Sequence, residues 1–126
     1  MNTTNNTPFP KAAFAVILEY GNIWVTTRDG KDQGKFGLPG GKQEEGEDIM
    51  QTAIRESSEE GLIVGEPGFL VHRAEVDGFD VHWFVFQSAK PLLEYKEKHR
   101  GIKPTMVSIE DAAKSGYGNE FLSRYL

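Results

Sequence analysis

Cysteine is absent from this chain of 126 residues, so it can contain neither a disulfide framework nor a thiolate site. Long apolar runs are absent too. The longest, residues 12–18, has the length of a strand, whereas a helix that crosses a membrane needs about 18 or more apolar residues. Residues 1–10 lack the basic and apolar segments of a secretory signal. We therefore expect a soluble, cytoplasmic protein that does not contact a membrane.

Basic residues are in the minority, with 14 Lys and Arg against 19 Asp and Glu and a formal net charge of −5. Nucleic-acid-binding domains are typically basic, so this balance argues against a dedicated nucleic-acid binder. It does not exclude small phosphorylated ligands, because a bound cation can supply the positive charge. Hydrophobic residues make up 38% of the chain, as is typical of globular proteins. We expect one domain over residues 11–126, after a flexible polar tail over residues 1–10.

Two segments, residues 12–18 and 81–86, are apolar at both odd and even positions, which is typical of strands covered on both faces. Each belongs to a predicted hairpin, the first with residues 23–27 and the second with residues 69–75. Strands covered on both faces, in a chain that also contains helices, predict an α/β sandwich with a mixed sheet.

A helix is predicted over residues 47–60, where apolar residues recur at helical spacing and Gly61 follows to end it. The charged residues 90–103 predict a loop. Three short elements complete the prediction: a strand over residues 105–109, a helix capped by Ser108 and a helix over residues 119–125.

Three glutamates, Glu56, Glu59 and Glu60, lie at positions i, i+3 and i+4 and so share one face of the predicted helix. Like charges at this spacing repel, and the helix dipole disfavours anions near the carboxyl end. A divalent cation among their oxygens removes both penalties, and Mg²⁺ is typically held by carboxylates together with substrate phosphates. The alternative is a solvated acidic face. Arg55 precedes Glu59 by four residues and can pair with it, either to hold its rotamer or as an ordinary surface pair.

Glycines dominate the segment before this helix, residues 37–42, which reads GLPGGK. Glycine lets the backbone approach a ligand closely. The same glycines are also consistent with a tight turn that binds nothing.

The spacing from Gly41 through Glu47 to Arg55 and the glutamates after it resembles the Nudix box, here over residues 41–63, and six fixed positions match. The predicted hairpin upstream of the box and the segment 106–111 also lie where members of that family have theirs. The resemblance therefore covers most of the chain and implies a Nudix-type α/β/α sandwich.

The chain departs from the family pattern at two positions. Ser57 stands where the family has an aliphatic residue, and Leu62 stands at the usual glycine position, with Gly61 one place earlier. The first change affects core packing and the second the exit from the helix. Neither removes a carboxylate.

The resemblance implies hydrolysis of a nucleoside diphosphate linked to another group, with Mg²⁺, or Mn²⁺ in its place, neutralising the phosphate charge. The cation ligands that it implies are the Gly40 carbonyl and the carboxylates of Glu56, Glu59, Glu60 and Glu97, with Glu94 as the alternative to Glu97. Arg55 and the three box glutamates are the implied catalytic residues, with Glu56 as the candidate base. Gly41 and Glu47 are implied structural residues of the box.

Within the family, the short chain and its LPGGK turn resemble the compact MutT-like enzymes that convert a (d)NTP to (d)NMP and pyrophosphate. This resemblance makes Arg28, Lys42 and Asn119 the candidate substrate-binding residues, with the Asn119 amide reading a purine edge, that of an oxidised purine included. The alternatives are that Asn119 caps the helix after it and that Arg28 is a solvated loop residue.

Other functions stay open at this point. An RNA 5′ end and ADP-ribose are alternative substrates, and a non-catalytic Nudix-fold ligand sensor is the alternative to an enzyme, although the presence of every box glutamate favours the enzyme. The basic residues that a 5′ end or a triphosphate could contact, if they are not simply solvated, are Lys90, Lys96, Lys98, Arg100 and Lys103. Trp83, Phe84 and Phe86 are predicted as core residues or, for one or two of them, as a wall that stacks on a base. We expect structural roles for His72 and His82.

Overall fold

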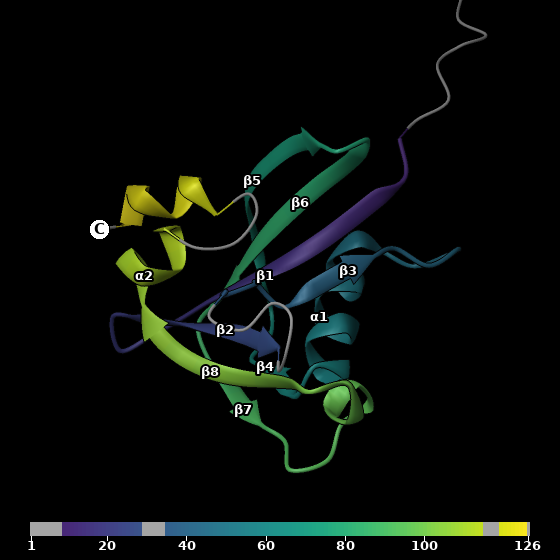
Figure 1. Ribbon diagram of the computed structural model, residues 1–126. Helices are drawn as coiled ribbons and strands as arrows, with labels where there is room; N and C mark the ends of the chain where they lie inside the picture. The colour runs from purple at the N-terminus through teal and green to yellow at the C-terminus, as the bar shows by residue number, and fades with distance from the viewer. Residues whose placement is uncertain (1–8, 29–34, 115–118, 126) are drawn as a thin grey trace, which may run out of the picture.

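The computed structural model describes residues 9–28, 35–114 and 119–125, so most of the predicted tail lies outside the described residues. A six-stranded mixed sheet, a two-stranded sheet and short helices make up the fold (Figure 1). None of the described helices is both long and apolar enough to cross a membrane. The predicted α/β architecture with a mixed sheet is confirmed.

The large sheet is organised around β1 (Lys11–Glu19), which pairs in parallel with β6 (Phe79–Phe86) and antiparallel with β2 (Asn22–Arg28). β5 (Phe69–Val76) extends the sheet beyond β6, and β8 (Ile102–Ser108) extends it beyond β2. Both predicted hairpins are present, as β1–β2 and β5–β6.

β3 (Gly40–Lys42) is a short strand that the sequence does not predict, because glycine pairs disfavour strands. It pairs antiparallel with the start of β1, where Gly41 lies opposite Ala13. A side chain at Gly40 would overlap the backbone of Ala13 and Phe14. The glycine is therefore what allows β3 to lie against β1.

The two faces of the large sheet carry separate cores. This is expected because its strands are apolar at both odd and even positions, so both faces must be covered. On one face, Ala12 and Val16 of β1 pack with Trp83 of β6 and with Ala112 and Leu122 near the carboxyl end. The other face packs against α1 through Ala13, Ala15, Ile17, Ala53, Phe84 and Phe86. These two cores make the molecule a three-layer sandwich.

α1 (Ile49–Glu59) begins later than the predicted residue 47, because Glu47 closes a turn before the helix. The Glu47 N–H donates to the Glu44 carbonyl (3.1 Å), and the Glu47 carboxylate accepts from the Glu44 N–H (3.1 Å). At the other end, Gly61 has a φ of 105°, so it ends the helix as predicted.

The prediction of a loop over residues 90–103 is wrong. β7 (Ala89–Pro91) pairs with β4 (Leu62–Val64), η2 (Lys96–Arg100) forms a 3₁₀ helix, and β8 begins at Ile102. Charge patterning missed these elements because their pairing partners are distant in sequence. Pro104, which disfavours a central strand, is accommodated because β8 is an edge strand.

The two short helices near the carboxyl end are present as α2 (Ile109–Lys114) and the 3₁₀ helix η3 (Glu120–Tyr125). Ser108 caps α2 as predicted, since its hydroxyl accepts from the Asp111 N–H (3.0 Å).

Candidate active site

An acidic cavity of about 390 Å³ lies at the carboxyl end of α1 and is hereafter called the carboxylate cavity. The helix contributes the three box glutamates, β3 contributes Gly40, and η2 contributes Glu97. The charged residues that line the cavity are Arg28, Glu44, Arg55, Glu56, Glu59, Glu60, Lys96, Glu97 and Arg100. The fold thus brings Glu97 to the box glutamates. Glu94, the alternative, is exposed and pairs with Lys98.

Glu56 lies directly against β3. A side chain on Gly41 would overlap the Glu56 carboxylate, so a glycine is needed at this position. Burial raises the pKa of Glu56, and the nearby Glu59 raises it further, while the adjacent Arg55 opposes both.

Glu60 is the most buried of the carboxylates, with 8% of its surface exposed. One of its oxygens accepts a hydrogen bond from the backbone N–H of Gly40 (3.3 Å). Burial raises the pKa of Glu60 to about 8, and the carboxylates of Glu56, Glu97 and Glu59 add to the effect. A buried carboxyl group with three acidic neighbours is a position where a bound cation stabilises the charged form.

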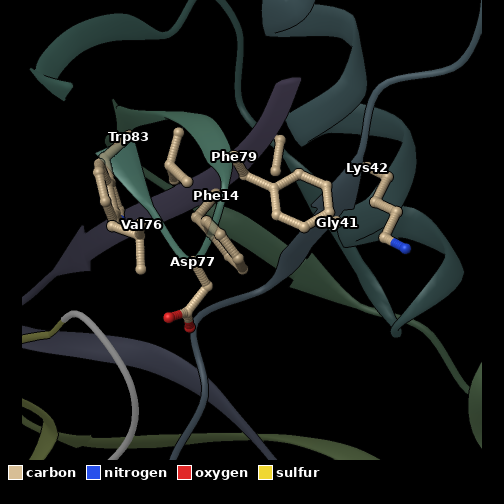
Figure 2. A pocket seen from close by; sticks show the side chains of 9 residues that line it. Phe14, Gly41, Lys42, Val76, Asp77, Phe79 and Trp83 are labelled. Atoms are coloured by element: carbon tan, nitrogen blue, oxygen red, sulfur yellow. The ribbon is translucent and has the colours of Figure 1, made fainter. Parts of the chain in front are cut away.

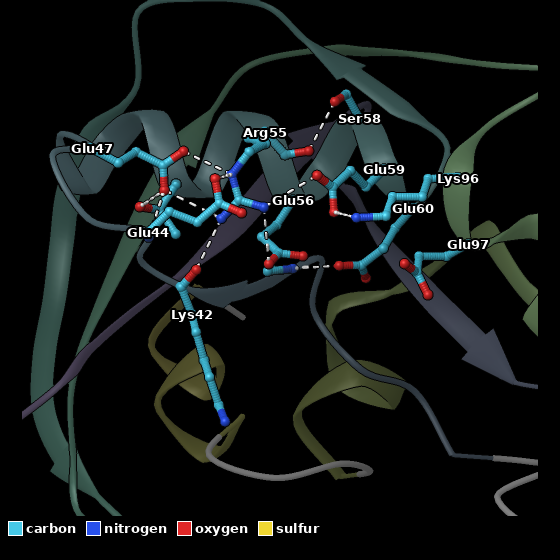
Figure 3. A network of polar contacts seen from close by, with 12 residues as sticks. Lys42, Glu44, Glu47, Arg55, Glu56, Ser58, Glu59, Glu60, Lys96 and Glu97 are labelled. Carbon is cyan, nitrogen blue, oxygen red and sulfur yellow. Dashed lines mark hydrogen bonds and ion pairs between the residues drawn. The ribbon is translucent and has the colours of Figure 1, made fainter.

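Arg55 connects the helix to the segment before it (Figure 3). Its Nε donates to Glu47 Oε2 (2.7 Å), and its Nη2 donates to Glu47 Oε1 (3.2 Å) and to the Lys42 carbonyl (2.9 Å). These hydrogen bonds lower the pKa of Glu47 to about 2. The Arg55–Glu59 pair predicted from sequence is present, from Nη1 to Oε2 at 3.2 Å. Arg55 donates two hydrogen bonds to Glu47 and one to Glu59, and this set is hereafter called the Arg55 clamp.

The donor chemistry fits a hard divalent cation, because five carboxylates, the four predicted ligands among them, and Gly40 line one cavity, and oxygen is the ligand that Mg²⁺ prefers. In the parts of the chain that the structure describes, no three acidic or histidine side chains converge closely enough to hold a cation as they stand. Three of the four predicted carboxylate ligands, Glu56, Glu59 and Glu97, are instead paired with basic side chains.

A second cavity, of about 360 Å³, is mainly apolar and is hereafter called the aromatic cavity (Figure 2). Its lining residues are Ala12, Phe14, Gly41, Lys42, Val76, Asp77, Phe79, Val81 and Trp83. The two cavities meet at β3, where Gly40 lines the carboxylate cavity and Gly41 and Lys42 line the aromatic cavity. Its volume is in the range of small-molecule sites.

Trp83 forms part of the aromatic wall and stacks on Phe14, with 6.1 Å between ring centroids. Phe84 and Phe86 point to the opposite core, as the alternation along a strand requires. Sequence reasoning missed Phe14, Phe79 and Asp77. No local signal in the sequence connects them, because residues 14, 77 and 79 come together only when β3 and β6 both pair with β1.

The candidate substrate-binding residues lie in different places. Arg28 lines the carboxylate cavity, and Lys42 lies at the aromatic cavity with its Nζ 5.3 Å from the centroid of the Phe79 ring. Asn119 lines neither cavity. It is 1% exposed, and its Nδ2 donates to the carbonyls of Phe36 (3.3 Å) and Ala112 (3.2 Å). In this structure the Asn119 amide joins two backbone segments and is not presented to a ligand.

Both histidines of the β5–β6 hairpin are packed within the protein, in line with their expected structural roles. His72 stacks on Phe121, with 4.5 Å between ring centroids, and lies 4.9 Å from Trp83. His82 is 6% exposed and lies 3.7 Å from Asp80. Burial lowers the pKa of both, which favours the neutral imidazole.

Comparison with known proteins agrees with this geometry. The protein-family model described as "NUDIX domain" matches residues 8–119 of this chain. A Mycobacterium tuberculosis protein named "Putative 8-oxo-dGTP diphosphatase 3" is 39% identical over 80 residues, which cover 60% of this chain and 35% of that protein. The match therefore spans about a third of the length of this curated relative.

Solved structures share the fold. A MutT structure from work on Aliivibrio salmonicida and Vibrio cholerae has a TM-score of 0.71 at 21% identity, covering 92% of this chain and 95% of that one. A MutT NUDIX hydrolase from Burkholderia pseudomallei has a TM-score of 0.70 at 19% identity, covering 93% and 97%. With the box glutamates gathered beside β3, these matches show that the chain belongs to the Nudix hydrolase family and has the fold of its MutT members.

Proposed function

We propose that this protein hydrolyses a nucleoside triphosphate to the monophosphate and pyrophosphate. The observation that carries the proposal is the junction of two cavities at β3. One is acidic and suits cations with a phosphate chain, and the other is aromatic and suits a base. A nucleotide that spans β3 would place its reacting phosphates beside the glutamates.

The carboxylate cavity would hold Mg²⁺, or Mn²⁺, through the Gly40 carbonyl, the box glutamates and Glu97. When bound, the cation neutralises charge on the phosphate chain, which is the main requirement of phosphoryl transfer. Arg28 at the end of β2 would contact the phosphates. Glu56 is the candidate to accept the proton of the attacking water, and the Arg55 clamp would hold the glutamates in position.

The aromatic cavity would hold the base between Phe14, Phe79 and Trp83. Asp77 is the acidic residue of its lining and lies at the β5–β6 turn (Figure 2). A carboxylate accepts two hydrogen bonds and so complements the adjacent N1–H and N2–H donors of guanine, which adenine lacks. We therefore favour a guanine nucleotide, which agrees with the name of the M. tuberculosis relative. We expect the protein to act on such nucleotides in the cytoplasm.

The test is a panel of nucleotides assayed for pyrophosphate and monophosphate in Mg²⁺, in Mn²⁺ and in excess EDTA. The panel includes dGTP, 8-oxo-dGTP, dATP, dCTP, ADP-ribose and a 5′-triphosphorylated RNA. We expect release of pyrophosphate from guanine nucleotides, and none in EDTA. Preferred cleavage of ADP-ribose or RNA would replace the triphosphate assignment. Binding without turnover of any member would identify a ligand sensor.

A further inference from the structure

The 3₁₀ helix η2 places two basic side chains against the acidic cavity. Lys96 Nζ lies 3.5 Å from Glu59 Oε1, and Arg100 Nη1 lies 3.2 Å from Glu97 Oε1. Both basic residues line the same cavity as the glutamates they pair with. Figure 3 shows Lys96 beside Glu59. Each of these pairs therefore uses a carboxylate oxygen that a divalent cation would require.

Glu59 pairs with two basic side chains, Arg55 and Lys96, and these two ion pairs differ in how firmly the basic partner is held. Its Oε2 is held by Arg55, which is also fixed by Glu47, whereas Lys96 is the partner of its Oε1 among the residues that the structure describes. The Arg55 side chain is 23% exposed and that of Lys96 is 65% exposed. A long, exposed lysine forms a weak ion pair with little cost of separation. Lys96 is thus the partner that a divalent cation can displace.

Arg100 stands in the same relation to Glu97. The Glu97 side chain is 16% exposed, while that of Arg100 is 65% exposed. The carboxylate is fixed within the cavity and the guanidinium reaches it from solvent. When a cation takes the carboxylate, the arginine remains attached to the rim of the same cavity.

We propose that Lys96 and Arg100 are exchangeable counter-cations, which pair with Glu59 and Glu97 in the cation-free protein and move onto the substrate's phosphates when divalent cations bind. No charged group loses its partner in this exchange. Each carboxylate exchanges a basic side chain for a cation, and each basic side chain exchanges a carboxylate for a phosphate. Arginine is suited to the second partner because its planar fork matches phosphate oxygens.

The phosphate half of this inference rests on the proposed function, whereas the cation half does not. The variants are Lys96→Gln and Arg100→Gln, with Lys98→Gln as the matched control. Lys98 is on the same helix and is also paired with a glutamate, Glu94, at 2.8 Å, but it does not line the cavity. All three side chains are largely exposed, so each variant is expected to fold.

The first measurement is Mn²⁺ binding without nucleotide, followed by electron paramagnetic resonance. Loss of the competing ammonium or guanidinium should tighten Mn²⁺ binding by about two- to five-fold, as expected for an exposed pair. Lys98→Gln should match the wild type. Unchanged or weaker Mn²⁺ binding in both cavity variants would overturn the exchange.

The second measurement is calorimetric binding of the α,β-methylene analogue of dGTP in saturating Mg²⁺. We expect about ten-fold weaker binding in Lys96→Gln and Arg100→Gln, as for a lost charged hydrogen bond. The proposal therefore predicts that the same variants bind Mn²⁺ more tightly and the nucleotide analogue more weakly. Unchanged analogue binding in these variants would refute transfer to phosphate. An analogue that binds the wild type without any nucleotide being hydrolysed would refute the proposed function alone.

Discussion

Arg55 and Glu47 are joined by two hydrogen bonds, from Nε to Oε2 at 2.7 Å and from Nη2 to Oε1 at 3.2 Å. Lysine cannot form this fork, so Arg55→Lys should lose the clamp while keeping the charge. We expect a loss of about 1–3 kcal/mol in the free energy of unfolding and a fall of at least about ten-fold in kcat. Denaturant melts and turnover would measure the two effects. Arg73→Lys is the control, because Arg73 forms a similar fork with Asp80 at an exposed site, and it should leave turnover unchanged.

Glu60 makes the stability of the cation-free protein depend on pH. Its pKa is raised from an ordinary 4.5 to about 8, so between these values the folded state binds a proton that the unfolded state has released. In EDTA, the contribution of Glu60 to the free energy of unfolding should therefore be fully present below about pH 4.5 and be lost as the pH rises to about 8. Added Mg²⁺ should restore it in proportion to the logarithm of its concentration. Thermal melts across this pH range, with EDTA and with Mg²⁺, measure both trends.

The variant Glu60→Gln separates the effect of this carboxyl group on turnover from its effect on stability. It should nearly abolish turnover, leave the EDTA-treated protein as stable as the wild type or more stable, and flatten its pH dependence. Glu110→Gln, at an exposed residue of α2, should change neither turnover nor the response to Mg²⁺. A loss of more than about 1 kcal/mol in Glu60→Gln, a typical destabilising effect, would make Glu60 a structural residue.

Gly41→Ala tests the close approach of β3 to the glutamates. Its new methyl group would overlap the Glu56 carboxylate and displace it, so we expect weaker Mn²⁺ binding and a fall of about ten-fold or more in kcat/KM. Gly37→Ala is the matched control, since a side chain there meets only Thr26 Oγ1 at an ordinary 3.5 Å. Equal effects of the two variants would mean that backbone stiffness, and not the displaced carboxylate, is responsible.

Asp77→Asn tests whether Asp77 recognises the base of the nucleotide. Asparagine tolerates the φ of 50° at this turn, but its amide nitrogen is a donor, so the side chain cannot accept one hydrogen bond on each of two atoms as a carboxylate does. The ratio of kcat/KM for dGTP to that for dATP should fall by about ten-fold. Glu75→Gln, on the same hairpin but outside the aromatic cavity, should keep the wild-type ratio. A uniform loss for both nucleotides would point to a change in the fold.

Local spacing predicted the helical part of the candidate site, because residues three and four apart on a helix must share a face. Glu56, Glu59 and Glu60 needed no knowledge of the topology. The approach of Glu97 depends on β4–β7 pairing and on η2, which charge patterning interpreted as a loop. The strands that are apolar at both odd and even positions predicted a sheet covered on both faces, also from local sequence alone.

The aromatic cavity could not be assembled from sequence, because its walls come from β1, β3 and the β5–β6 hairpin. Asn119 shows the opposite case. Its residue type suggested base recognition, whereas its burial and two backbone carbonyl partners became visible only when residues 36 and 112 were placed beside it.

β3 has a consequence for substrate length. Gly40 borders the carboxylate cavity, and Gly41 and Lys42 border the aromatic cavity. The strand is fixed in register against β1, with Gly40 opposite Phe14 and Lys42 opposite Ala12. Since a strand advances about 3.3 Å per residue, the partition between the cavities is a rigid spacer of less than about 10 Å. If a nucleotide spans β3 as proposed, this spacer would favour ligands in which the base and the reacting phosphorus are separated by a matching distance. Discrimination by length would then be set by the sheet and not by the loops at the rim.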